Sequence, residues 1–124
     1  MIAIVDDDES VREATKSLVR SLGYQAATFG SAEEFLGSPL MTATDCLITD
    51  VKMTGLSGVE LHDRLIADGY RMPTIFISAF PHQRVQQHVL GNGAIGYLRK
   101  PFSEDRLIKF IETALESRTA MITP

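Results

Sequence analysis

Short runs of hydrophobic residues alternate along the chain with longer segments whose hydrophobic positions recur every three or four residues. A run without polar alternation is typical of a strand buried on both faces, and the second pattern is typical of an amphipathic helix. The predicted strands cover residues 2–5, 24–29, 46–49, 74–77 and 94–98. The predicted helices cover about residues 10–22, 31–36, 58–67, 83–90 and 104–117.

Capping residues mark two of these helix starts. Ser31 and Glu34 have the spacing of a capping box, and Ser103 is expected to cap the last helix. Strands that alternate with helices predict an α/β fold, a doubly wound five-stranded parallel sheet covered by five helices. The flavodoxin-like strand order 2-1-3-4-5 is expected. Residues 1–118 are expected to form this domain, and residues 119–124 a short tail.

Composition and charge narrow the class of protein. The 124 residues fit one domain, and a hydrophobic content of 44% is enough for a core. The net charge of −4 argues against direct binding to nucleic acid. The single cysteine excludes an internal disulfide, so a reducing cytoplasm is expected. No hydrophobic run approaches the roughly 20 residues that a membrane-spanning helix needs.

Acidic residues follow two strands that the expected order makes neighbours. Asp6 and Asp7 follow the first strand, and Asp50 follows the third. Ligand sites of such sheets lie between these two strands, beyond their carboxyl ends. Carboxylates crowded there repel one another, and a hard cation such as Mg²⁺ would relieve the repulsion. Ser78 after the fourth strand adds a hydroxyl, and Lys100 after the fifth adds a positive charge.

Four segments, in this order and at this spacing, resemble the receiver domains of two-component response regulators. They are residues 4–8, 47–53, 75–79 and 96–102, so the resemblance covers essentially the whole chain. Residues 31–36 resemble the nitrogen-fixation regulator (FixJ-type) subgroup. The resemblance implies a CheY-like fold and a cytoplasmic phosphorelay protein. It also implies no enzyme in the usual sense, because self-phosphotransfer and autodephosphorylation are the only reactions expected.

The resemblance also implies roles at the acidic edge. Asp50 would accept a phosphoryl group from a sensor histidine kinase. Mg²⁺ or Mn²⁺ would be held by the carboxylates of Asp7 and Asp50, with help from Asp6. The backbone carbonyl of Lys52 would be a further metal ligand.

Other implied roles concern the phosphoryl group and the switch. Lys100 and Ser78 would contact phosphoryl oxygens, and a cis peptide would join Lys100 to Pro101. Ser78 and Tyr97 would form the switch, with Tyr97 turning inward on phosphorylation. The surface of the fourth helix, fifth strand and fifth helix would then change and control an output such as transcription. Homodimerisation on phosphorylation and a C-terminal effector domain outside this chain are family expectations.

Three positions depart from the family pattern. Ser78 replaces the commoner threonine and should preserve the hydrogen bond. Thr54 follows Met53 where the family usually has proline, which restores a backbone N–H to this loop. Phe80 stands two residues after Ser78, where small or polar residues are more usual. One interpretation is that Phe80 shields an acyl phosphate from water. The other is that its ring packs against the fourth helix.

Three other functions share features with this sequence pattern. An aspartyl-phosphate phosphohydrolase would usually carry a second aspartate two residues after the nucleophile, where this chain has Lys52. A flavin-binding module would need a glycine-rich and hydroxyl-rich phosphate loop after the first strand, where this chain is acidic. A receiver-like module that binds partners without phosphorylation remains an alternative, and Thr54 keeps it open.

Overall fold

The strands form one parallel sheet. The computed structural model describes the backbone of residues 1–122 and the side chains of residues 1–116. Within this range five strands pair in the order β2-β1-β3-β4-β5, which confirms the predicted order. The strands are β1 Ile2–Val5, β2 Ala26–Phe29, β3 Cys46–Asp50, β4 Thr74–Ser78 and β5 Gly96–Arg99.

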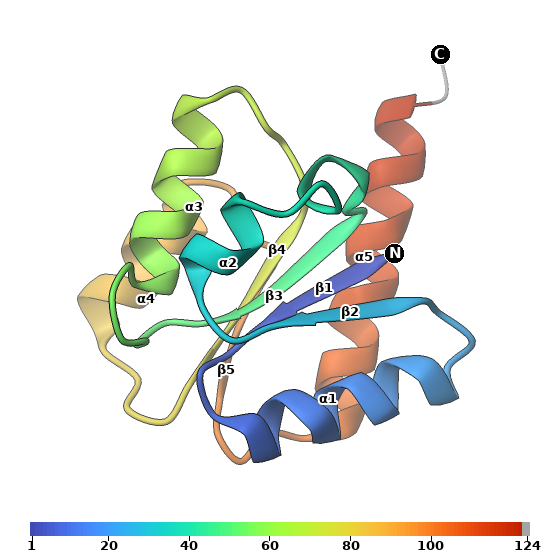
Figure 1. Ribbon diagram of the computed structural model, residues 1–124, viewed down its shortest axis with the longest axis horizontal. Coiled ribbons are helices and arrows are strands. Elements are labelled where there is room, and N and C mark those ends of the chain that lie inside the picture. The colour runs from blue at the N-terminus through green and yellow to red at the C-terminus, as the bar shows by residue number, and fades with distance from the viewer. Residues whose placement is uncertain (123–124) are drawn as a thin grey trace.

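Helices cover both faces of the sheet. They are α1 Glu9–Ser21, α2 Ala32–Leu36, α3 Gly58–Ala67, α4 Gln83–Gly91 and α5 Glu104–Ile122, with a 3-10 turn at Met41–Ala43. In Figure 1, α1 and α5 lie on one face, and α2, α3 and α4 lie on the other. This arrangement is the predicted doubly wound, CheY-like architecture.

Two separate cores fill the space between the sheet and its helices. On one face, side chains of α1 and α5 such as Val19, Leu107 and Ile111 pack on the sheet. On the other face, Phe35 of α2 and Leu61 of α3 pack on the sheet, while α4 contributes a smaller cluster. Strands buried on both faces explain the uninterrupted hydrophobic runs.

Some element boundaries differ from the predicted ones. The edge strands β2 and β5 begin at Ala26 and Gly96, two residues later than predicted. An edge strand pairs with one neighbour, so its hydrophobic run need not coincide with its ladder. Helix α5 continues to Ile122 instead of ending near Ser117, because no glycine or proline interrupts residues 104–122.

The predicted capping box of α2 is only half formed. The Ser31 hydroxyl accepts from the Glu34 N–H at 3.0 Å, as predicted. The Glu34 carboxylate, however, accepts from the N–H of Gly30 and not from that of Ser31. A reciprocal capping box occurs instead at Ser57 and Glu60, where α3 begins.

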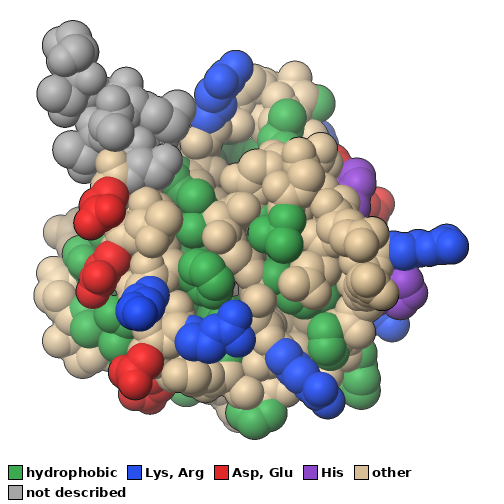
Figure 2. Space-filling model, turned by 180° about the vertical axis from the view of Figure 1, so that it is seen from behind, with side chains coloured by type: hydrophobic (Ala, Val, Ile, Leu, Met, Phe, Trp, Pro, Cys, Tyr) green, Lys and Arg blue, Asp and Glu red, His purple; other side chains and the backbone are tan. Residues whose placement is uncertain are grey.

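The surface carries charges of both signs. Figure 2 shows acidic and basic side chains on the same face, with hydrophobic side chains lying between them. Among the helices that the structure describes, none combines the length and the apolarity needed to cross a bilayer.

Candidate functional site

Three carboxylates meet at the carboxyl ends of β1 and β3. Asp6 and Asp7 directly follow β1, and Asp50 is the last residue of β3. One oxygen of each carboxylate lies within 4.8 Å of the oxygens of the other two. Parallel pairing of β1 with β3 produces this cluster, because both strands end at the same edge of the sheet.

Lys100 binds two of these carboxylates. Its Nζ lies 2.9 Å from Oδ2 of Asp50 and 3.0 Å from Oδ2 of Asp6. Its backbone N–H donates to the Ser78 carbonyl at 2.8 Å, and a cis peptide joins it to Pro101, as expected. Burial alone would lower the pKa of Lys100, but the hydrogen bonds to the two carboxylates raise it overall. The site therefore holds a fixed positive charge.

The pKa of the Asp50 carboxyl group depends mainly on its burial. The Asp50 residue is 7% exposed, and burial is the main cause that raises its pKa. The hydrogen bond from Lys100 acts in the opposite direction, whereas the charge of Asp6 raises the pKa further. Lys100 therefore favours the ionised form of Asp50, against the effect of burial.

Asp7 is oriented by the residue that departs from the family pattern. Its Oδ2 accepts from the backbone N–H of Thr54 at 3.1 Å, and the Thr54 hydroxyl lies 3.5 Å away. A proline at this position has no N–H and could not make the first bond. Thr54 therefore ties the loop after β3 to an exposed carboxylate of the cluster.

The loop after β3 is held from both of its ends. The Lys52 N–H donates to Oδ1 of Asp50 at 3.4 Å, and the Leu56 N–H donates to Oε1 of Glu33 at 2.6 Å. Gly58 then starts α3 so close to β3 that a Cβ there would overlap the carbonyl oxygen of Asp50. These contacts fix the backbone around Asp50. The role of the Lys52 carbonyl as a metal ligand stays a prediction.

Ser78 is the last residue of β4, and Phe80 lies on the loop that follows. Ser78 is buried, and its hydroxyl accepts from the Phe80 N–H at 3.2 Å. The Phe80 side chain is 79% exposed, so the reading in which its ring packs against α4 is wrong. Shielding of a phosphoryl group by this ring stays a prediction.

Tyr97 occupies the inner position. It is 8% exposed and packs with Phe76 and Val89, and its hydroxyl is buried without a hydrogen-bond partner. The ring thus lies inside the protein, and its turning inward on phosphorylation stays a prediction. In α4, Val89 is fully buried, whereas Leu90 is 41% exposed. The hydrophobic pattern of so short a helix did not settle which side chains face inward.

The donor set at this edge fits a hard divalent cation. Asp6, Asp7 and Asp50 offer carboxylate oxygens, which Mg²⁺ prefers, and the exposed Asp7 leaves a side open to solvent. Lys100 offsets part of the negative charge, which limits the mutual repulsion of the cluster.

Two contributions to the site had no clear signal in the sequence. The bond from Thr54 to Asp7 depends on where the loop folds, although the presence of an N–H was predictable. The close approach of Gly58 to Asp50 is a contact between the start of a helix and the end of a strand. The only sign of this contact in the sequence was a glycine in the first turn of a predicted helix.

Comparison with known proteins identifies the family. The family description "Response regulator receiver domain" matches residues 2–112. The response regulator protein TmoT of Ectopseudomonas mendocina is 41% identical over 116 residues, which are 94% of this chain and 53% of that protein. The transcriptional regulatory protein FixJ of Bradyrhizobium diazoefficiens is 32% identical over 92% of this chain and 56% of its own length.

Solved structures agree with this match. The structure of the response regulator StyR superimposes with a TM-score of 0.90 at 37% identity, over 97% of this chain and 61% of that one. This chain therefore belongs to the response regulator receiver domains of two-component systems. It spans about half the length of the curated relatives it matches.

Proposed function

We propose that this receiver domain accepts a phosphoryl group on Asp50 from the phosphohistidine of a sensor kinase. The observation that supports it best is the double contact of Lys100 with Asp50 and Asp6 inside a three-carboxylate cluster. An ammonium group at this place can pair with a phosphoryl oxygen once the group is transferred.

The reaction is an in-line transfer between two nucleophiles. A carboxylate oxygen of Asp50 forms a bond to phosphorus as the bond from phosphorus to the kinase imidazole breaks. The electron pair of that bond goes to the imidazole nitrogen, which then takes up a proton. Mg²⁺ held by the carboxylates of Asp6, Asp7 and Asp50 would offset the negative charge that gathers during transfer. Lys100 holds Asp50 in place and favours its ionised form.

Signalling would follow from the position of Ser78 next to this site. Ser78 ends β4 beside Asp50, because Ile77 pairs with Asp50 in the parallel ladder. A phosphoryl group on Asp50 would draw the Ser78 hydroxyl away from the Phe80 N–H and towards a phosphoryl oxygen. The inner position of Tyr97 would then become the favoured one over an outer position. The α4-β5-α5 surface would report the change.

The output proposed for this surface is control of transcription. Relatives such as FixJ are transcriptional regulatory proteins, and this chain covers about half of each. An effector domain beyond this chain, homodimerisation on phosphorylation and a cytoplasmic location belong to the same proposal. Transfer to itself and autodephosphorylation are the only reactions it assigns to the domain.

Intact-mass spectrometry with acetyl phosphate tests the proposal. The wild type should gain one phosphoryl adduct with Mg²⁺ and little without it, and Asp50→Asn should gain none. Asp8→Asn is a matched control: Asp8 lies outside the cluster and caps α1, and asparagine caps equally well. Equal labelling of Asp50→Asn would refute the assignment. A wild type that stays unlabelled by both acetyl phosphate and a phosphorylated kinase would favour the phosphorylation-independent alternative.

A further inference from the structure

Carboxylates hold much of the loop between β3 and α3, residues 51–57. Four backbone N–H groups of this loop donate to acidic side chains. They are the N–H groups of Lys52, Thr54, Leu56 and Ser57, which bond to Asp50, Asp7, Glu33 and Glu60 in that order. Residues 51–57 contain no proline, and Gly55 has a φ of +81°, so the backbone itself restrains this loop little. The conformation of the loop therefore depends on these side chains.

The four carboxylates differ in what else they do. Asp7 and Asp50 belong to the acidic cluster, so they would have to serve a cation and the loop at once. Glu60 belongs to the capping box of α3 and acts only where the loop ends. Glu33 lies outside the acidic cluster and reaches the loop from α2. Of these four carboxylates, Glu33 is therefore the one that can hold the loop from another element whether or not the cluster is occupied.

Glu33 contacts the loop closely. Its Oε1 accepts from the Leu56 N–H at 2.6 Å, which is the shortest of the four bonds. A Cβ on Gly55 would lie 2.9 Å from Oε1 and 3.1 Å from Oε2 of Glu33, so a side chain at this position would push the carboxylate away. The Ser31 hydroxyl caps α2, and Phe35 of the same helix is fully buried. Glu33 thus joins a firmly packed helix to the loop.

We infer that Glu33 is a positioning residue for the metal site: it holds the loop after β3 so that Lys52 and Thr54 stay in place around the acidic cluster. The inference rests on the proposed function, because the Lys52 carbonyl is a predicted ligand of Mg²⁺. Thr54 lies two residues before Leu56, and its N–H orients Asp7. Loss of the bond from Leu56 to Glu33 lets this part of the loop move, and the affinity for Mg²⁺ falls as a result.

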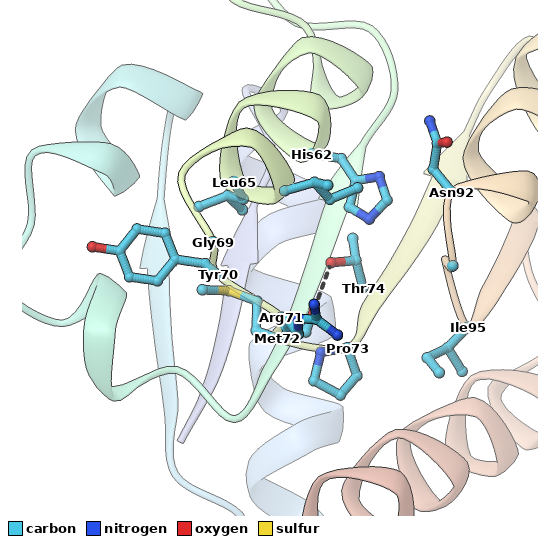
Figure 3. Close-up of a pocket in the computed structure, with 12 residues that line it drawn as sticks. His62, Leu65, Gly69, Tyr70, Arg71, Met72, Pro73, Thr74, Asn92 and Ile95 are labelled. Atoms are coloured by element: carbon cyan, nitrogen blue, oxygen red, sulfur yellow. Dashed lines mark hydrogen bonds between the residues drawn. The ribbon is translucent and has the colours of Figure 1, made fainter. Parts of the chain in front are cut away.

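NMR titration of the unphosphorylated protein with Mg²⁺ tests this role without any phosphoryl transfer. Glu33→Ala should bind Mg²⁺ about three- to tenfold more weakly than the wild type, as expected for the loss of one hydrogen bond. Its Leu56 N–H signal should be shifted even before Mg²⁺ is added. Thr74 and Ile95 line the pocket shown in Figure 3, near the starts of β4 and β5 and away from the loop, so their signals should not shift.

Two further variants separate the hydrogen bond from the charge. Glu33→Gln removes the same negative charge, but its amide oxygen can still accept from the Leu56 N–H, so it should bind Mg²⁺ like the wild type. Glu34→Ala is the matched control, because Glu34 is the next residue of α2 and its carboxylate accepts from the N–H of Gly30 instead of from the loop. This variant should also bind Mg²⁺ like the wild type.

Wild-type affinity for Mg²⁺ in Glu33→Ala, or binding by Glu33→Gln as weak as that of Glu33→Ala, would overturn the positioning role. Labelling by acetyl phosphate gives a second readout: in Glu33→Ala it should slow by the same factor at low Mg²⁺ and recover at saturating Mg²⁺. A rate that stays low at saturating Mg²⁺ would contradict an effect through the metal site. A wild type that takes up no phosphoryl group would count against the proposed function alone, because the Mg²⁺ titration does not require the transfer.

Discussion

Replacing Gly58 with alanine should destabilise the protein, although helix propensity predicts the opposite. Alanine is better than glycine in a helix by roughly 1 kcal/mol. In this structure the added Cβ would overlap the carbonyl oxygen of Asp50, and it would lie 2.9 Å from the carbonyl carbon and 3.1 Å from the Thr49 hydroxyl. Two of these atoms belong to the backbone of a buried strand, so they cannot rotate away.

The size of the effect follows from these contacts. Overpacking in a rigid core costs about 1 to 3 kcal/mol and sometimes more. A movement of α3 away from Asp50 would also weaken the hydrogen bond from the Gly58 N–H to the Val51 carbonyl, now 2.9 Å long. Overlap with a backbone atom places the cost at the upper end of this range, about 3 kcal/mol. After the gain in helix propensity is subtracted, we expect a net loss of about 2 kcal/mol.

Urea denaturation measures this loss, and a second glycine provides the control. Gly91 ends α4, and a Cβ there would meet nothing within 4 Å. Gly91→Ala should therefore keep or raise the free energy of unfolding by about 0.5 kcal/mol. If Gly58→Ala were as stable as Gly91→Ala, the close packing of the α3 start against Asp50 would be wrong.

Further predictions concern the acidic cluster and two buried groups. Thr54→Pro removes the N–H that orients Asp7, so it should weaken Mg²⁺ binding roughly tenfold, as measured by fluorescence or NMR titration. Thr54→Val keeps this N–H and should bind Mg²⁺ like the wild type. Lys100→Met leaves the buried carboxylates of Asp6 and Asp50 without the positive charge of the lysine. In EDTA it should lower the free energy of unfolding by about 3 kcal/mol, and added Mg²⁺ should partly reverse this loss. Burial lowers the pKa of His62 in the folded state, so the protein should lose stability as the pH falls below about 6.5, the value for an unperturbed histidine. In urea titrations at pH 7 and pH 5, His62→Phe should lose less free energy of unfolding than the wild type. Burial raises the pKa of Cys46 to about 12, so a disulfide reagent at pH 8 should react slowly with the folded protein and quickly in urea.

The sequence allowed the fold to be predicted because its hydrophobic runs report burial directly. A central strand such as β3 is buried along its whole length, and its predicted range of residues 46–49 differs from the observed one by a single residue, Asp50. The edge strand β2 is only partly buried, and its start was misplaced. The end of α5 was also misplaced, since a helix without a stop signal can continue.

The parts of the site that the strand order brings together could be predicted from the sequence. Strand order alone brings the residues that follow β1 and β3 together, which is why the carboxylates were expected to meet. The bond between Thr54 and Asp7 depends on the conformation of a loop and lies beyond such reasoning. The bond from Leu56 to Glu33 joins this loop to a helix, and no spacing in the sequence marks it.

Mapping the phosphorylated residue is the measurement that bears most directly on the proposed function. After incubation with acetyl phosphate and Mg²⁺, borohydride reduction converts an aspartyl phosphate to homoserine, and peptide mass spectrometry locates it. We expect conversion at Asp50 alone. Conversion at Asp6 or Asp7, or no conversion of the folded protein with either acetyl phosphate or a phosphorylated kinase, would contradict the assignment of Asp50 as the phosphoacceptor.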